Sequence, residues 1–123
     1  MPFSHTVEDR VVHVAWHGLV SKEDLQAFGK EMPQIVASLG FVPDVLHTFE
    51  AVDGYGFQPI TVYMFSLLRK RVHIPTPVRS AVVATTPDTR SLAKVFKALN
   101  RTKNLEMDIF DSEAVARRWL KRE

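Results

Sequence analysis

The residues from Val78 to Leu99 constrain the fold more than any other stretch of the sequence. Residues 79–85 are a short apolar run of small and β-branched side chains, too short for a helix and typical of a strand covered on at least one face. A helix start follows, because Thr86 can cap it, Pro87 needs no N–H there, and Asp88 complements the positive helix end. The next apolar residues share one helical face: Leu92, Val95, Phe96 and Leu99. The stretch therefore predicts a strand leading into an amphipathic helix, which is half of a βαβ unit.

The chain has 123 residues, and we expect it to form one domain over residues 1–123 with a core of its own. It is 46% hydrophobic and 24% charged, which is typical of a soluble globular protein rather than a disordered one. It has no cysteine, which excludes disulfides, thiolate catalysis and cysteine-bound metal. The sequence contains no transmembrane-length apolar run and no signal-peptide pattern. The net charge of +2 is too small to indicate a nucleic-acid-binding protein.

The N-terminal residues predict a β-hairpin. Phe3–Glu8 and Val11–His17 are expected to form two strands around a tight turn at residues 9–10. We expect Gly18 to end the second strand. In that strand one face is apolar and the other is mixed, because alternate residues point to opposite faces of a sheet.

A long helix is expected after the hairpin. Ser21 is a suitable N-cap, with acidic residues in the first turn behind it. Pro33 lies inside the helical pattern, so we expect it to kink or split the helix. Gly40 is a natural residue for the left-handed position that ends a helix.

The middle of the chain predicts a strand, a loop and a second helix. Val45–Phe49 is the strand, and a loop with two glycines and two aromatic residues follows from Glu50 to Gln58. The helix from about Pro59 to Arg71 is apolar almost around its whole circumference, more than one core-facing stripe needs. Three interpretations stay open: the helix is buried between the sheet and its neighbours, forms a homodimer interface, or lines a pocket for an apolar ligand.

A short fifth strand at Met107–Phe110 and a final helix capped by Asp111 or Ser112 complete the expected order, β-β-α-β-α-β-α-β-α. Strands separated by single helices must pair in parallel, so the fold class is α/β with a mixed, mostly parallel sheet of five strands. Polar residues recur on one side of several strands: His13, His17, Thr48 and Asp108. A sheet covered on both faces would be apolar on both, so we expect helices mainly on one face.

In this order of elements the chain resembles the STAS / SpoIIAA-like family, the anti-sigma-factor-antagonist fold. It is most similar to the SpoIIAA-like branch that is grouped with lipid-binding Sec14-type domains. The matching stretches are the hairpin with Trp16–Leu25, the strand Pro77–Val83, and the ending Ile109–Leu120. The resemblance implies a cytoplasmic bacterial module that acts by binding and is not an enzyme, with no cofactor.

In the anti-sigma-factor antagonists of this family, a phosphorylatable serine lies in an Asp-Ser-Ser-Gly motif between the third strand and the next helix. The corresponding position here is Asp53-Gly54-Tyr55-Gly56, which keeps the aspartate and the final glycine but neither serine. Ser66 lies well inside the following helix and cannot replace them. The sequence therefore predicts a module without the serine phospho-switch.

The same loop is the predicted recognition surface for a protein partner or ligand. Its glycines are expected to allow a tight turn from which Tyr55 projects, while Phe57 turns to the core. Truncating Tyr55 distinguishes a contact residue from the alternative that both rings fold back as a lid. The expected contact residues are Asp53, Gly54, Tyr55, Gly56 and Phe57, with Tyr63 and Met64 from the adjoining helix.

Metal binding and catalysis have weaker support. Among the five histidines only His13 and His17 share a strand face, and a zinc site needs three or four convergent ligands. The titratable loop residues Glu50, Asp53 and Tyr55 form no recognisable catalytic group, and there is no phosphate-binding glycine loop of the GxxxxGK[ST] type. We expect neither a metal site nor catalytic residues.

The region from Arg69 to Lys103 carries nine basic residues and one acidic residue. Within the third predicted helix, four of them form a stripe opposite the apolar face: Arg90, Lys94, Lys97 and Arg101. The simpler interpretation is a solvated helix face. The alternative is a contact surface for an anionic partner: an acidic protein, nucleic acid or anionic lipid headgroups.

Two functions of different classes are therefore compared. The leading hypothesis is a non-enzymatic STAS-like binding module, a regulatory adaptor that contacts a protein partner through residues 50–58 and the adjoining helix. The alternative is a domain that binds an apolar or lipid-like ligand in a pocket beside the helix at 59–68.

Overall fold

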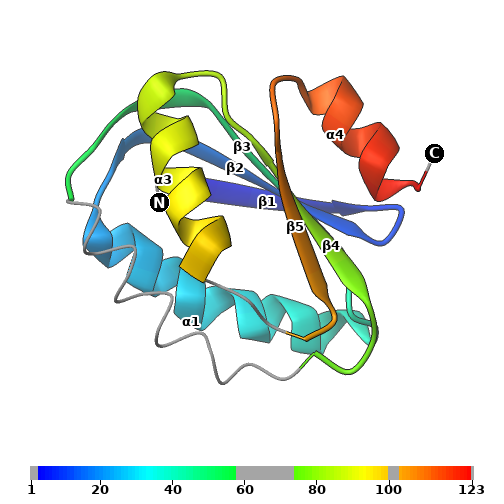
Figure 1. Ribbon diagram of the computed structural model, residues 1–123. Coiled ribbons are helices and arrows are strands. Elements are labelled where there is room, and N and C mark those ends of the chain that lie inside the picture. Colours follow the sequence, from blue (N-terminus) through cyan, green and yellow to red (C-terminus); the bar gives the residue numbers. More distant parts are fainter. Residues whose placement is uncertain (1–2, 58–73, 100–102, 123) are drawn as a thin grey trace.

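The computed structural model describes residues 3–57, 74–99 and 103–122 (Figure 1). The predicted helix from Pro59 to Arg71, with Tyr63 and Met64, lies outside these residues, as does Arg101. The described elements, in chain order, are β1 (Phe3–Glu8), β2 (Val11–Val20), α1 (Lys22–Leu39), β3 (Asp44–Tyr55), β4 (Val78–Val83), α3 (Pro87–Leu99), β5 (Leu105–Phe110) and α4 (Glu113–Leu120).

One five-stranded sheet organises the molecule, and its strands lie in the order β1-β2-β3-β4-β5. β1 is antiparallel to β2, and the other neighbours pair in parallel. This arrangement confirms the predicted α/β class and the mixed, mostly parallel sheet.

The N-terminal hairpin has the predicted turn. Asp9 and Arg10 have φ angles of 51° and 65°, both in the left-handed region that a two-residue type I′ turn requires. Gly18, however, does not end β2. It has a φ of 69° beside an irregularity in the β2–β3 ladder, and the strand resumes and continues to Val20.

Helix α1 begins and ends at the expected residues. The Ser21 hydroxyl accepts a hydrogen bond from the Asp24 backbone N–H, the Asp24 carboxylate accepts one from the Ser21 N–H, and Gly40 ends the helix with a φ of 74°. Of the two expected effects of Pro33, a kink or a split, the split does not occur, because α1 is one continuous element. Phe28 and Ile35, on either side of Pro33, both belong to the same core cluster, which holds the two halves to one face of the sheet.

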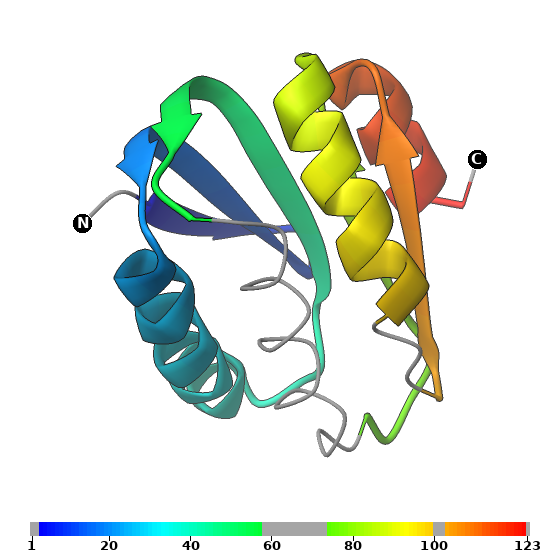
Figure 2. The same cartoon turned by 60° about the vertical axis from the view of Figure 1, so that its left-hand side comes forward.

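The three described helices are divided between the two faces of the sheet (Figure 2). α1 and α3 cover one face, where an aromatic core contains Phe3, Trp16 and Phe28. α4 lies on the other face and contacts β3, β4 and β5. The β1–β2 half of that second face carries exposed residues such as Thr6 and His17, so helices are mainly on one face, as predicted.

Candidate functional site

The C-terminal ends of β2 and β3 extend beyond the rest of the sheet. β1 pairs with β2 only as far as Trp16, and β4 pairs with β3 only over Val45–Thr48. Beyond these limits His17–Val20 and Ala51–Tyr55 pair only with each other, and we call this two-stranded part the β2–β3 extension. The loop expected from Glu50 is therefore wrong up to Tyr55, because the continuation of β2 past Gly18 supplies a pairing partner.

The two glycines of the predicted recognition loop do not form the expected turn. The described glycines with positive φ are Gly18 and Gly40, and neither Gly54 nor Gly56 is among them. A Cβ on Gly54 would meet Leu19 Cδ1 at 3.7 Å, which is ordinary contact. Gly56 donates its N–H to the Val20 carbonyl at 2.8 Å and so continues the extension by one bond.

Tyr55 turns toward α3 instead of projecting into solvent. Its half-buried ring brings the hydroxyl into hydrogen-bond contact with the Thr89 hydroxyl, and Thr89 also accepts a hydrogen bond from the Thr86 hydroxyl at 3.0 Å. Burial raises the pKa of Tyr55 above its ordinary value, the negative charge of Asp88 adds to this rise, and the hydrogen bond to Thr89 opposes it. Tyr55 therefore fastens the end of β3 to the start of α3 through its neutral hydroxyl.

Thr86 has its predicted role at the start of α3. Its hydroxyl accepts a hydrogen bond from the Thr89 backbone N–H at 3.3 Å.

An apolar cavity of about 100 Å³ lies between α1, the sheet and α3. Six of its lining residues are aromatic: Trp16, Phe28, Phe49, Tyr55, Phe57 and Phe96. Tyr55 and Phe57 meet edge to face with ring centroids 5.6 Å apart, and both pack against the aromatic core. Phe57 thus lies where the sequence predicted, and Tyr55 lies beside it.

The exposed part of the predicted site is the outer surface of the β2–β3 extension. Asp53 and Gly56 are exposed, and Leu19 beside Gly54 is 65% exposed, more than the other exposed large apolar residues of the described chain. Sequence reasoning did not select Leu19, because it placed the end of β2 at Gly18. The sequence did contain a signal for it: Leu19 and Val20 are apolar and β-compatible, and they follow Gly18 directly.

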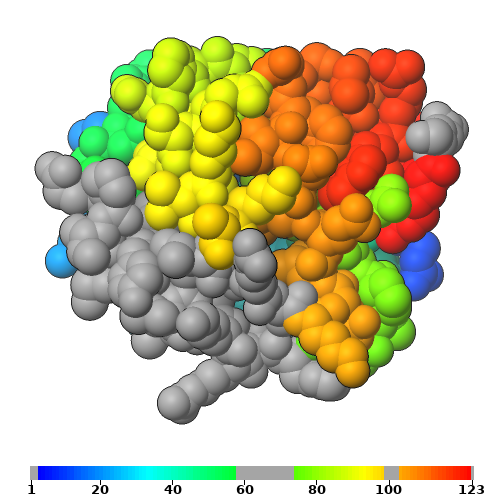
Figure 3. All heavy atoms as spheres, in the orientation of Figure 1, coloured from blue at the N-terminus to red at the C-terminus, as the bar shows by residue number. Residues whose placement is uncertain are grey.

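The basic stripe on α3 is partly neutralised by its neighbours. Arg90 forms an ion pair with Asp111, and Lys97 Nζ lies 3.2 Å from Asp108 Oδ1. Figure 3 shows α3 and β5 side by side on the surface, which brings these opposite charges together. Lys94 is exposed and has no ion pair among the described residues. The stripe as a contact for an anionic partner stays a prediction.

His13, on the second sheet face, contacts two other side chains. His13 Nε2 lies 2.9 Å from the Thr48 hydroxyl, and its Nδ1 lies 3.4 Å from an Arg117 guanidinium nitrogen. Arg117 also forms an ion pair with Glu113 at 2.8 Å. Within residues 3–57, 74–99 and 103–122, no three metal-ligating side chains are grouped together, and no helix is long and apolar enough to cross a membrane.

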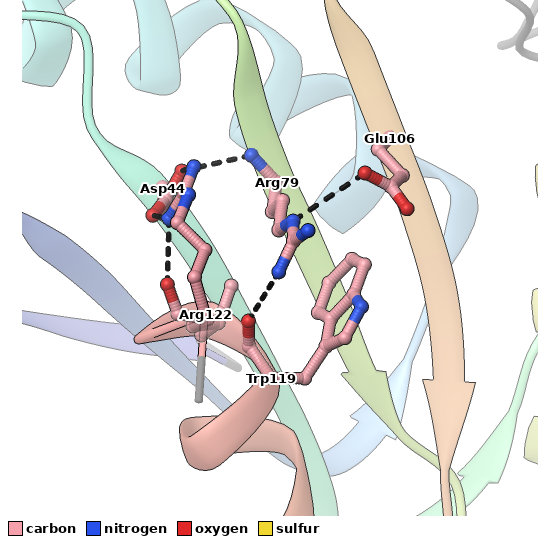
Figure 4. Close-up of polar contacts among 6 residues, drawn as sticks. Asp44, Arg79, Glu106, Trp119 and Arg122 are labelled. Atoms are coloured by element: carbon pink, nitrogen blue, oxygen red, sulfur yellow. Dashed lines mark hydrogen bonds and ion pairs between the residues drawn. The ribbon is translucent and has the colours of Figure 1, made fainter.

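At the opposite end of the sheet, polar contacts join α4 to β3 and β4 (Figure 4). The Asp44 carboxylate accepts hydrogen bonds from the Arg79 backbone N–H and from the Arg122 guanidinium, both at 2.8 Å. The Arg79 guanidinium donates to the Trp119 carbonyl at 2.6 Å, lies over the Trp119 ring, and pairs with Glu106 at 3.4 Å. We call these five residues the C-terminal clasp. Two of them, Asp44 and Arg122, border an open groove of about 610 Å³ with mixed charges.

Comparisons with solved structures identify the fold. A crystal structure of a DUF3478-family protein with a SpoIIAA-like fold from Shewanella loihica PV-4 matches with a TM-score of 0.61 and 13% identity, over 96% of this chain and 91% of that one. The anti-sigma factor antagonist SpoIIAA in its unphosphorylated form matches with a TM-score of 0.58 and 14% identity, over 94% and 96%. No protein-family model matches the chain, and no curated protein is significantly similar to it in sequence. The chain has a SpoIIAA-like fold, as its sequence resemblance predicted.

Proposed function

We propose that this chain is a STAS-like binding module, a regulatory adaptor that works without a serine phospho-switch. The likeness of nearly the whole chain to an anti-sigma factor antagonist supports a regulatory role through protein binding rather than catalysis. The segment Asp53–Gly56 contains no serine, so control of binding by serine phosphorylation at that position has no acceptor residue.

The observation that carries the proposal is the exposed surface of the β2–β3 extension. Leu19 is 65% exposed beside the exposed carboxylate-bearing Asp53, at the end of the sheet where the extension stands clear of β1 and β4. An exposed apolar side chain flanked by a charged group is a suitable centre for a protein contact. Tyr55 and Phe57 pack against the aromatic core and so fix the position of the end of β3, which carries this surface.

The alternative function, binding of an apolar or lipid-like ligand, has less support. The aromatic cavity measures about 100 Å³, whereas pockets for small molecules typically measure roughly 300–1,000 Å³. The cavity among the described residues is therefore smaller than a typical ligand pocket, and the helix at 59–68, beside which the pocket was predicted, lies outside these residues.

Photo-crosslinking tests the proposal. A photoreactive amino acid at position 19 should crosslink to a discrete protein in a lysate of the source cells, and the same residue at position 115 should not. Val115 is a matched control because it is also exposed, at 43%, but lies on α4. The Asp53→Lys variant should weaken the crosslink at position 19. Equal crosslinking from both positions, or none from position 19, would contradict the proposal.

A further inference from the structure

The outer edge of β1 is a row of backbone groups that no described residue pairs. Because the hairpin has a two-residue turn, Glu8 and Val11 next to it exchange both of their backbone hydrogen bonds. Bonded pairs alternate along such a ladder, so the N–H and C=O groups of Phe3, His5 and Val7 point away from β2. By the same alternation, the backbone groups of Arg10 point toward β3 and not toward β1. The Arg10 carbonyl accordingly accepts a hydrogen bond from the Asp44 N–H at 3.1 Å.

The opposite edge of the sheet is protected in a way that the β1 edge is not. On β5, Glu106 pairs with Arg79 and Asp108 pairs with Lys97, which places charged side chains along that edge. On β1 the one residue that carries a full charge is Glu8 at its end, and Val7 is 42% exposed. An edge of this kind is a ready template for another strand.

We propose that β1 pairs antiparallel with β1 of a second copy of this chain, joining two sheets into one. In the register that uses all the outward groups, His5 lies opposite His5 of the partner subunit, and Phe3 lies opposite Val7 of the partner subunit. Three bonded pairs of this kind make about six backbone hydrogen bonds. The same register places the exposed Val7 directly opposite Phe3 of the partner subunit.

A second copy suits this edge better than an unrelated strand because the edge is complementary to itself. Residues that lie opposite each other across the two-fold axis are on the same face of the joined sheet. The α1 helices of both copies therefore lie on the same face of that sheet. Glu8 falls beyond the last bonded pair, so no like charges oppose each other within the paired segment. His5 and Val7 are exposed on the face that α1 covers elsewhere, which leaves room for the second copy.

The oligomeric state of the intact chain tests the proposal. Sedimentation equilibrium at micromolar concentrations should give a dimer for the wild type and for His5→Ala, which keeps the backbone donor. His5→Pro lacks the outward N–H but needs no bond to β2 at that residue, so it should fold and be monomeric. A monomeric wild type overturns the proposal, and so does a dimer that survives His5→Pro, because it uses another surface.

A crosslinking variant keeps the test decisive if His5→Pro fails to fold. The chain has no cysteine, so His5→Cys introduces a single thiol at the two-fold axis. A short bismaleimide crosslinker should join His5→Cys chains into covalent dimers, whereas the exposed control Val115→Cys should stay monomeric under the same conditions. Failure of His5→Cys to crosslink, or equal crosslinking of the control, overturns the proposed register.

Discussion

The two faces of the sheet hold their helices by different means. Under α1 and α3 the contacts are aromatic. The ring centroid of Trp16 lies 5.0 Å from that of Phe3 and 5.3 Å from that of Phe28, and the indole stacks on Phe49. Under α4 the buried residues are smaller and include Ala81 and Ala116. Polar contacts of the C-terminal clasp supplement them there.

The difference follows from the lengths of the helices. α1 has 18 residues and α4 has eight, and a helix as short as α4 is not stable alone in water. The small side chains let α4 approach the sheet closely, and the clasp fixes its C-terminal end. Helix α1 is therefore held mainly by the burial of its apolar side chains, whereas α4 is held by burial together with a few specific polar bonds.

The largest effect is expected from the aromatic face. Trp16→Ala should lower the free energy of unfolding by about 3–5 kcal/mol, because the indole is buried among other rings. Trp119→Ala on the α4 face should cost roughly half as much, since that ring is only half-buried. Urea denaturation of both variants measures the difference. Equal losses would show that the two faces are held alike.

On the α4 face, the apolar anchor should matter next. Leu120 is 3% exposed, so Leu120→Ala should cost about 2–5 kcal/mol. Val115→Ala on the same helix should change stability by less than about 0.5 kcal/mol, because Val115 is exposed. Thermal unfolding of the pair measures this, and a large effect of Val115→Ala would mean that α4 packs differently.

Within the C-terminal clasp, the two partners of one ion pair should differ. Asp44→Ala should cost about 1–3 kcal/mol, because it leaves the Arg79 backbone N–H without its acceptor. Arg122→Ala should cost about 0–1 kcal/mol, since that side chain is largely exposed and its ion pair is screened by solvent. Urea denaturation of both variants at low and high salt measures this. Equal losses would contradict the assigned role of Asp44.

The hydroxyl contact between β3 and α3 should contribute less. Tyr55→Phe keeps the ring and removes the bond to Thr89, so it should cost about 0.5–1.5 kcal/mol. Tyr55→Ala should cost more, since it also removes the packing against Phe57.

The same contact predicts a pH dependence. The pKa of Tyr55 is raised in the folded state, so its stabilisation is complete below the unfolded value of about 10 and is lost as the pH rises through the folded value. The stability difference between wild type and Tyr55→Phe should therefore shrink above about pH 10. A constant difference would show that the hydroxyl ionises alike in both states.

The smallest effect on folding is expected on the α3 surface. Lys94→Glu should change stability by less than about 0.5 kcal/mol, because Lys94 is exposed. If the stripe binds polyanions, this variant should elute from a heparin column at lower salt, and adding Lys97→Glu should lower it further. Unchanged elution would leave the stripe as a solvated face.

The sequence predicted the features that depend on neighbouring residues. The tight turn at Asp9 and Arg10, the capping of α1 by Ser21 and the start of α3 at Thr86 are each set by contacts within a few residues. Local patterns decide such features whatever the rest of the chain does.

The features that were missed depend on distant residues. β3 continues to Tyr55 because His17–Val20 lies beside it, and no local pattern shows that pairing. Tyr55 turns inward because Thr89, 34 residues away, offers a hydroxyl. The exposed Leu19 became a candidate contact only when the end of β2 was known.

The order of the strands in the sheet equals their order in the chain, and this bears on how the protein is made. Each strand that leaves the ribosome finds its pairing partner already synthesised and at the growing edge of the sheet. The clasp is the exception, because Arg122 follows Asp44 by 78 residues. At synthesis rates of roughly 5–20 residues per second, that separation lasts about 4–16 s. During most of that interval α4 has not been synthesised and the apolar residues that it covers are exposed, so we expect the second sheet face to be a transient binding site for chaperones until Arg122 has been added.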